Sequence, residues 1–235
     1  MITNLDTILE HAVDSLRQAV GENLYSCCVY GSAVRGNMIV GLSDINLLIV
    51  LNESTAAAHK VVEAALRKYP KVDPFILGRR GFERSVRAFA PKFASIQQHY
   101  RIIHGADPLA GITLDPKLEK FLCEQALRNL RLRMVFSFVT RHKNKDYNHF
   151  LVRNVTPFFV QFSEALRLHG LVLPDDFSLQ IPLMEKEFKL DAAVLRELLE
   201  LKKATKAFSD AELVAWHDKL FPVVDTMLVW METNW

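Results

Sequence analysis

The stretch that decides the fold consists of two runs, Val29-Tyr30-Gly31-Ser32-Ala33-Val34-Arg35-Gly36 and Leu42-Ser43-Asp44-Ile45-Asn46-Leu47-Leu48-Ile49-Val50. The apolar residues 24–30 predict a strand that ends in a glycine-serine turn, and a second apolar strand begins after one acidic residue. Side chains alternate between the two faces of a strand, so Asp44 and Asn46 are expected on one face, opposite Ile45. The stretch therefore predicts a polar pair beside a glycine turn.

This layout suits the binding of phosphate groups. Gly31 can adopt the positive φ of a tight turn and lets a ligand approach the backbone without meeting a Cβ atom. Ser32 offers a hydroxyl and a backbone N–H to a phosphate oxygen. A carboxylate on the neighbouring strand, such as Asp44, can hold Mg²⁺ against the same phosphates. The residues point to the transfer of a phosphoryl or nucleotidyl group.

The same motifs resemble those of the nucleotidyltransferase superfamily that includes polymerase beta and kanamycin nucleotidyltransferase. The resemblance rests on Gly31-Ser32, Arg35-Gly36 and Ser43-Asp44-Ile45-Asn46-Leu47-Leu48-Ile49-Val50. The superfamily pattern is Gly-Ser, a spacer of about ten residues, and Asp-x-Asp on a strand. The one departure is Asn46, which stands where the superfamily has its second aspartate.

The resemblance implies a catalytic group composed of Asp44, Asn46 and Asp73. Asp44 and Asn46 would hold Mg²⁺, and Asp73, the nearest acidic residue on the strand expected at 72–77, would supply the third carboxylate. Asp73 has an alternative interpretation, because it precedes Pro74 at the start of that strand. In that interpretation it is a strand-entry aspartate with no role in the site.

The resemblance also implies a nucleoside triphosphate, with ATP as the first candidate, bound together with Mg²⁺. Gly31, Ser32 and Arg35 would contact this small-molecule partner. Arg35 has the alternative of a solvated loop arginine, which is common for charges in loops. The acceptor of the transferred group is not identified, and the oligomeric state, a homodimer included, is left open by the sequence.

Asn46 bears on the mechanism, because two-metal transfer relies on carboxylates to bring the ions together. An asparagine can coordinate through its carbonyl oxygen but adds no negative charge. Two functions therefore stay open. The first is an enzyme that moves a nucleoside monophosphate from a nucleoside triphosphate to a small molecule or a protein side chain. The second is a protein of the same fold that has lost this chemistry and acts as a nucleotide-binding or partner-binding module.

The fold class expected is α+β, with a mixed sheet of nucleotidyltransferase fold flanked by helices and followed by a helical bundle. A shift in composition at Thr113-Leu114-Asp115-Pro116 predicts a boundary between two domains, 1–114 and 115–235. The resemblance implies that the first is nucleotidyltransferase-like, and the second is expected to be helical. Beyond the shift only helical periodicity remains, enough for four or five helices. Their order resembles that of kanamycin nucleotidyltransferase and its bacterial relatives.

Several local patterns refine this expectation. Pro74 cannot donate a ladder hydrogen bond, so it is expected in an edge strand or among the first residues of its strand. Residues 101–105 resemble the edge strand that closes the catalytic domain in bacterial members of the superfamily. Asn52 is expected to cap a helix from about Glu53 to Tyr69. Asp115, followed by Pro116, is expected to begin a helix that runs to about residue 143.

Basic residues are frequent in this helical half and have two interpretations. They are Arg128, Arg131, Arg133, Arg141, His142, Lys143 and Lys145. They could bind phosphate or an anionic acceptor. They could equally form a solvated helix face with a basic C-terminus, which the helix dipole favours.

Composition excludes several other classes of protein. The net charge of +2 gives no global argument for nucleic acid as a partner. Three cysteines, at 27, 28 and 123, have neither the spacing of a metal site nor that of a disulfide framework. No apolar run approaches the length of a membrane span, and the N-terminus does not resemble a secretory signal. A cytoplasmic protein without a membrane partner is therefore expected.

Overall fold

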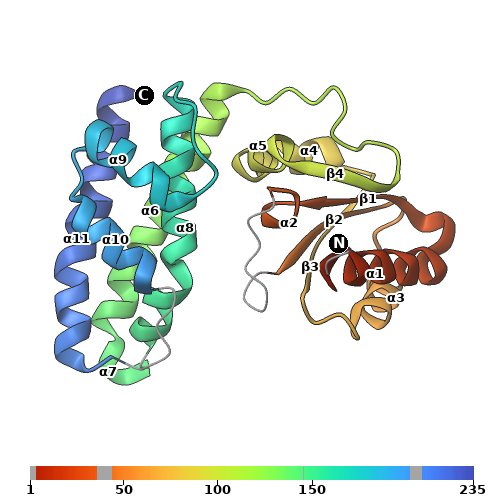
Figure 1. Cartoon of the computed structure of the whole chain (residues 1–235), viewed down its shortest axis with the longest axis horizontal. Helices are drawn as coiled ribbons and strands as arrows, with labels where there is room; N and C mark the ends of the chain where they lie inside the picture. Colours follow the sequence, from red (N-terminus) through yellow and green to blue (C-terminus); the bar gives the residue numbers. More distant parts are fainter. Residues whose placement is uncertain (1–3, 36–43, 145, 202–207) are drawn as a thin grey trace. The chain divides into compact units, whose positions relative to one another are not determined.

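The computed structural model describes residues 4–35, 44–144, 146–201 and 208–235. The chain divides into two compact units, Met1–Leu114 and Asp115–Trp235, and each has its own hydrophobic core (Figure 1). All strands of the described residues lie in the first unit, and the second unit is helical. The α+β class expected from the sequence is confirmed.

A mixed four-stranded sheet forms the centre of the first unit. The elements are α1 (Asn4–Val20), η1 (Gly21–Asn23), β1 (Leu24–Tyr30), α2 (Ser32–Arg35), β2 (Ile45–Leu51), α3 (Ala56–Leu66), β3 (Val72–Gly78), α4 (Phe82–Ala88), α5 (Ala90–Gln98) and β4 (Tyr100–Gly105). The strand order is β3-β2-β1-β4. Strand β1 is antiparallel to both β2 and β4, and β2 is parallel to β3. Strand β3, which contains Pro74, and strand β4 are both edge strands, as predicted.

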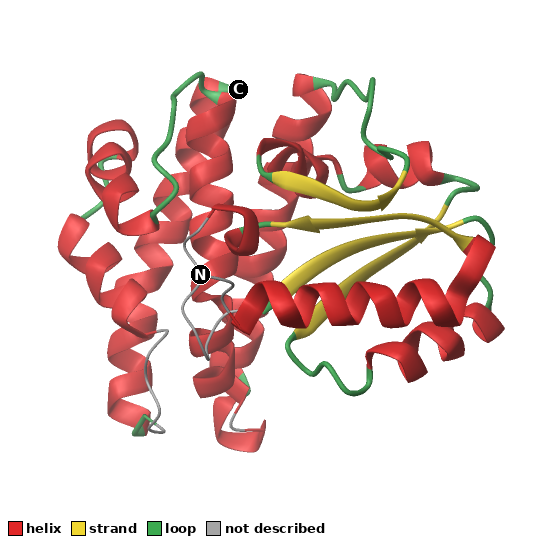
Figure 2. Cartoon of the chain, turned by 45° about the vertical axis from the view of Figure 1, so that its right-hand side comes forward, coloured by secondary structure: helices red, strands yellow, loops and turns green. Residues whose placement is uncertain are grey.

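Helices cover both faces of this sheet (Figures 1 and 2). On one face, α1 and α3 pack against alternate residues of β2, including Ile45 and Leu47. On the other face, α4 and α5 pack against Leu48 and Val50. Because successive side chains of a strand point to opposite faces, this division fixes the face to which each residue of β2 belongs. Asn46 belongs to the face covered by α4 and α5.

The end of β4 depends on a glycine that approaches the backbone of β1. Gly105 has φ +76°, and a Cβ atom there would lie 2.0 Å from the carbonyl oxygen of Tyr25. Any residue with a Cβ atom at position 105 would clash with this carbonyl and force β1 and β4 apart.

Replacing Gly105 with alanine is therefore expected to destabilise the first unit by more than the roughly 1–3 kcal/mol of a strained backbone conformation alone. The control is Gly111→Ala, because Gly111 has a similar φ of +73° but open space where its Cβ would lie. Thermal unfolding followed by circular dichroism compares the two variants. Equal shifts of the melting temperature would contradict the close approach of Gly105 to Tyr25.

The second unit is built from six helices in the described residues. They are α6 (Pro116–Val139), α7 (Arg141–Asn144), α8 (Asp146–Leu168), α9 (Phe177–Phe188), α10 (Ala192–Leu201) and α11 (Asp210–Asn234). Asp115 caps α6 as predicted, since its carboxylate accepts a hydrogen bond of 3.0 Å from the Lys117 N–H. Within the described ranges no helix is long and apolar enough to cross a membrane.

Two predicted helix boundaries are wrong. Thr55, not Asn52, caps α3, because its hydroxyl accepts the Ala58 N–H at 3.1 Å. The Asn52 side chain instead donates to the Glu22 carbonyl at 2.8 Å and ties the end of β2 to η1. The long helix expected to reach residue 143 ends at Val139, with Thr140 as its C-terminal cap, and α7 follows as a separate turn.

Three of the basic residues of this unit pair with carboxylates of the same unit. Arg128 pairs with Glu124 and Glu232, at 2.7 and 2.6 Å. Arg131 pairs with Asp225 at 3.1 Å, and Arg141 pairs with Asp210 at 2.8 Å. These pairs link α6 and α7 to α11 and favour a structural role for the three arginines.

Candidate functional site

A row of polar side chains crosses the sheet where β1 ends and where β2 and β3 begin. Tyr30 of β1 lies opposite Asn46 of β2, and Asn46 lies opposite Asp73 of β3. Paired residues of neighbouring strands point to the same face, so these side chains share one face of the sheet. Tyr30 belongs to the core beneath α4 and α5, which identifies that face.

Asp44 lies next to this row, just before the start of β2. It immediately precedes β2, is exposed, and lies two residues before Asn46, while Ile45 between them is buried in the core of the opposite face. Asp44, Asn46 and Asp73 thus come from two neighbouring strand starts. None of these three side chains forms a hydrogen bond or ion pair with another residue in the described ranges, so they are available to a ligand.

The glycine turn lies directly against the row. Gly31 has φ +75°, as its expected role in a tight turn requires, and its N–H donates to the His99 carbonyl at 3.2 Å. A Cβ atom on Gly31 would lie 3.4 Å from the Asn46 amide nitrogen. Ser32 begins the short helix α2, whose Val34 N–H donates to the Gly31 carbonyl at 3.0 Å.

Three further residues of the predicted motif cannot be placed. Arg35 is the last residue of α2, but its side chain lies outside the described part of the structure. Gly36 and Ser43 lie outside the described residues altogether.

Lys92 is a residue of this site that the sequence did not reveal. It comes from α5, and its Nζ lies 4.4 Å from the ring centroid of Phe75 and 5.7 Å from that of Tyr30. Burial of the ammonium lowers the pKa of Lys92, although the residue as a whole is exposed, and the negative charge of Asp73 opposes this shift. No motif marks Lys92, because only the packing of α5 on the sheet brings it to Phe75 and Tyr30.

Tyr30 is a neutral phenol at physiological pH. Its burial raises its pKa to about 12, and the nearby charge of Asp73 acts in the same direction. Its position at the end of an apolar strand, one residue before Gly31, is a signal that could have identified it in the sequence. A protonated Tyr30 can donate a hydrogen bond within the row.

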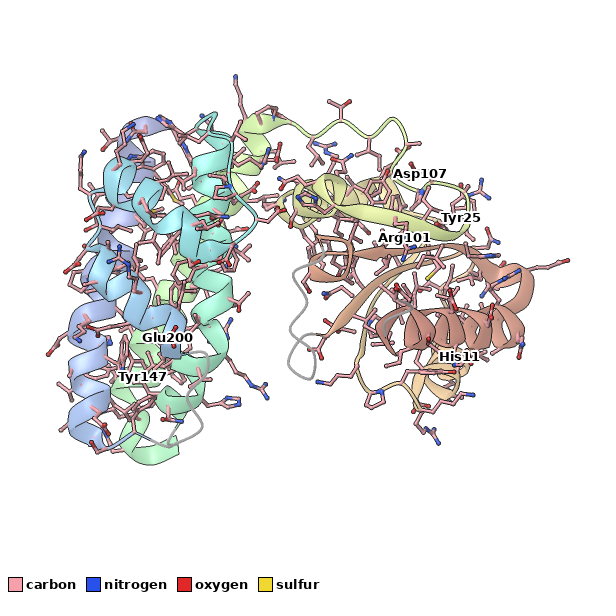
Figure 3. The ribbon with its side chains drawn as sticks, in the orientation of Figure 1. His11, Tyr25, Arg101, Asp107, Tyr147 and Glu200 are labelled. Carbon is pink, nitrogen blue, oxygen red and sulfur yellow. The ribbon has the colours of Figure 1, made fainter. Side chains whose placement is uncertain are left out.

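Tyr100 of β4 pairs with Tyr30 and continues the same row to the other edge of the sheet. Its hydroxyl donates to Asp107 at 2.8 Å, and Asp107 also accepts the Leu109 N–H at 2.9 Å. Asp107, labelled in Figure 3, therefore fixes Tyr100 and the turn after β4. These interactions are structural, and the candidate site ends at Tyr30.

The donor set suits one magnesium ion better than two. Asp44 offers carboxylate oxygens and Asn46 an amide oxygen, and Mg²⁺ prefers oxygen ligands shared between the protein and substrate phosphates. In the part of the chain that the structure describes, no three His, Cys, Asp or Glu side chains form a group that could hold a metal by themselves. The residues fit an ion completed by a bound triphosphate.

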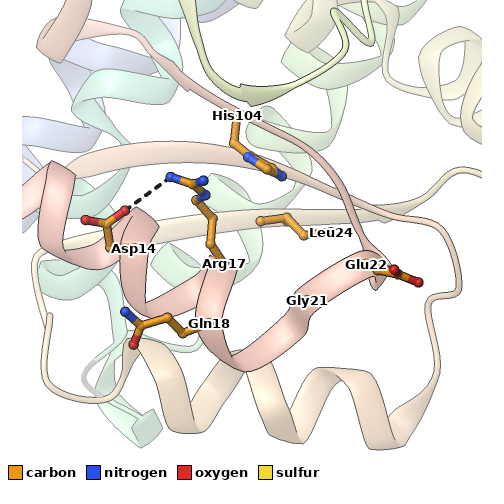
Figure 4. A pocket seen from close by; sticks show the side chains of 7 residues that line it. All are labelled: Asp14, Arg17, Gln18, Gly21, Glu22, Leu24 and His104. Carbon is orange, nitrogen blue, oxygen red and sulfur yellow. Dashed lines mark hydrogen bonds and ion pairs between the residues drawn. The ribbon is translucent and has the colours of Figure 1, made fainter.

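A separate open cavity of about 670 Å³ lies at the opposite end of β1 (Figure 4). It is lined by Asp14, Arg17, Gln18, Gly21, Glu22, Leu24 and His104. Asp14 and Arg17 form an exposed ion pair of 3.5 Å across its wall. Because Leu24 begins β1 and Tyr30 ends it, this cavity is distinct from the candidate site.

Comparison with known proteins gives a similarity in fold. No protein-family model matches the sequence, and no curated protein matches it. Among solved structures, the chain is similar to spectinomycin adenyltransferase AAD(9) from Enterococcus faecialis, whose crystal structure contains ATP and spectinomycin. The TM-score is 0.64 at 8% sequence identity, and the similarity covers 97% of this chain and 99% of that chain. The chain therefore has the fold of that nucleotidyltransferase.

Proposed function

We propose that this protein transfers a nucleoside monophosphate from a nucleoside triphosphate, with ATP as the first candidate, to a hydroxyl group of a small-molecule acceptor. The observation that carries the proposal is the alignment of Asn46 with Asp73 across β2 and β3, beside the Gly31 turn and two residues after Asp44. Their freedom from other described partners supports a role in binding. The fold shared with an adenyltransferase crystallised with ATP is consistent with it.

Each residue has a role in this proposal. Asp44 and Asn46 hold Mg²⁺, which would neutralise charge on the triphosphate. Ser32 donates to a phosphate oxygen, and Gly31 leaves room for the phosphate beside Asn46. Arg35, by the superfamily resemblance, adds a positive charge toward the triphosphate.

Asp73 is proposed to accept the proton of the reacting hydroxyl. The acceptor oxygen forms a bond to the α-phosphorus, and the bond from that phosphorus to the oxygen shared with the β-phosphorus breaks. Pyrophosphate leaves with that bonding electron pair, and the hydroxyl proton passes to the Asp73 carboxylate. Asp73 is suited to this role because it is exposed at the end of the row.

Isothermal titration with ATP and Mg²⁺ tests the nucleotide site. Wild type is expected to bind, and Asp44→Asn is expected to weaken binding at least by the roughly 10- to 100-fold loss typical of disturbing a metal site. The control is Asp14→Asn, which removes an equal charge from an exposed position of the same unit. A wild-type protein that does not bind ATP would refute the proposal.

Release of pyrophosphate in the presence of hydroxyl-bearing compounds tests the transfer. Spectinomycin is the first acceptor to try, because the structurally similar enzyme was crystallised with it. Asn46 favours a second candidate function, a nucleotide-binding module without chemistry. For that module, the expected result is ATP binding without pyrophosphate release for any compound in a panel of hydroxyl-bearing acceptors.

A further inference from the structure

We propose that the Lys92 ammonium supplies the second positive charge of this site, in the place where a two-metal enzyme holds its second ion. This inference rests on the proposed function and extends it, because it gives the site one metal ion and one protein ammonium in place of two metal ions. It also explains how transfer could proceed with an asparagine at position 46.

The acidic side chains of this site carry less negative charge than a two-metal site needs. Two-metal sites rely on carboxylates that bridge or flank both ions. In this site Asp44 and Asp73 carry the negative charge, and Asn46, two residues after Asp44 and opposite Asp73, carries none. Because Asp73 is kept for the hydroxyl proton, Asp44 is the one carboxylate left to balance a divalent ion, and a second divalent ion would be held mainly by the substrate. A single positive charge from the protein matches this reduced set of acids.

Lys92 is anchored by the packing of its helix, α5. Its neighbour Phe93 is fully buried, with its ring centroid 5.9 Å from that of Phe75 and 5.7 Å from that of Phe82. Ile96, one turn further along α5, is buried in the same core. Helix α5 is therefore fixed on the face of the sheet that carries the polar row. Lys92, at the start of this helix, is held beside the row rather than on a mobile loop.

Two aromatic rings lie against the Lys92 ammonium. Lys92 Nζ lies over the faces of Phe75 and Tyr30, which attract a cation through their ring quadrupoles. Phe75 follows Asp73 by two residues on the same face of β3, and the Asp73 charge acts on Lys92. In the described ranges Lys92 forms no ion pair. The structure thus keeps a cation near Asp73 without neutralising it by direct contact.

The consequence is a defined role in the transfer. A fixed positive charge beside Asp73 stabilises the negative charge that develops on the acceptor oxygen and the phosphoryl group in the transition state. Lys92 gives up no proton in this step, since the hydroxyl proton goes to Asp73. Its contribution is the electrostatic stabilisation of the developing negative charge.

Counting bound ions tests this inference without any acceptor. The probe is Mn²⁺, measured by electron paramagnetic resonance in the presence of α,β-methylene-ATP, which cannot release pyrophosphate. Wild type and Asn46→Asp are each expected to bind one Mn²⁺ with the nucleotide, because Lys92 still fills the second place. The double variant Asn46→Asp/Lys92→Met is expected to bind two, because a carboxylate replaces the amide and the ammonium is gone. Lys92→Arg is the control that keeps the charge and is expected to bind one ion.

The outcomes separate this inference from the proposed function. Two Mn²⁺ ions in wild type, or one in a folded double variant, would overturn the role of Lys92 and leave nucleotide binding intact. A wild-type protein that binds no nucleotide would overturn the proposed function itself. The single variant Asn46→Asp keeps Lys92, so it can be measured even if the Lys92 variants fail to fold. Two bound Mn²⁺ ions in Asn46→Asp would also overturn the inference.

Discussion

Replacing Arg167 with methionine is expected to destabilise the helical unit by about 3–5 kcal/mol, the usual result of leaving buried charges without a partner. Arg167 pairs with Glu119 of α6 and with Glu164 of its own helix, at 2.6 Å for the latter. The two glutamate side chains are only 6% and 7% exposed. Burial raises the pKa of Glu119, and the charge of Arg167 opposes that shift. Methionine fills much of the same volume but leaves two carboxylates without a cation.

Tryptophan fluorescence during urea unfolding measures this loss in the helical unit alone. All three tryptophans, Trp216, Trp230 and Trp235, lie in residues 115–235, so the first unit does not contribute to the signal. The matched control is Arg131→Met, whose pair with Asp225 is half exposed and is expected to contribute about 0–1 kcal/mol. A similar loss in both variants would show that Arg167 does not balance the buried carboxylates. Adding Glu119→Gln and Glu164→Gln to Arg167→Met is expected to restore part of the stability.

The strands of the first unit could be predicted because their signals are local. The apolar run 24–30 coincides with β1, and Gly31 follows it with the positive φ that was expected. Pro74 predicted an edge strand because a proline cannot donate to a neighbouring strand. Such features depend on a few consecutive residues, so they can be identified in the sequence without knowledge of the tertiary packing.

The partners within the site could not be predicted, because they depend on register and packing. Whether Asp73 faces the row is set by the pairing of β2 with β3, and a slip of one residue would turn it to the other face. The position of Lys92 depends on how α5 docks against the sheet, and no short pattern encodes this. Asn52 was a plausible cap by residue type, but Thr55 took that place because Asn52 is engaged with Glu22.

Replacing Asp73 with asparagine is expected to reduce the turnover of nucleotide transfer by about 10²–10⁴-fold, the usual contribution of a positioned general base. The affinity for ATP and Mg²⁺ is expected to change little, because Asp44 and Asn46 hold the ion in the proposed arrangement. Asparagine keeps the shape of the side chain at an exposed position, so the fold is expected to persist. Pyrophosphate release with an acceptor identified in the panel measures turnover, and titration calorimetry measures binding.

The comparison with Asp44→Asn decides what Asp73 does. If Asp44 holds the ion and Asp73 takes the proton, the first variant loses binding and the second loses only turnover, although both lose one negative charge from the same end of the sheet. A site that responded only to total charge would lose binding in both. If Asp73→Asn kept full turnover, Asp73 would be the strand-entry aspartate of the alternative interpretation, and another group would have to accept the proton. The pairing of Asp73 with Asn46 favours the first result, since it places Asp73 within the polar row.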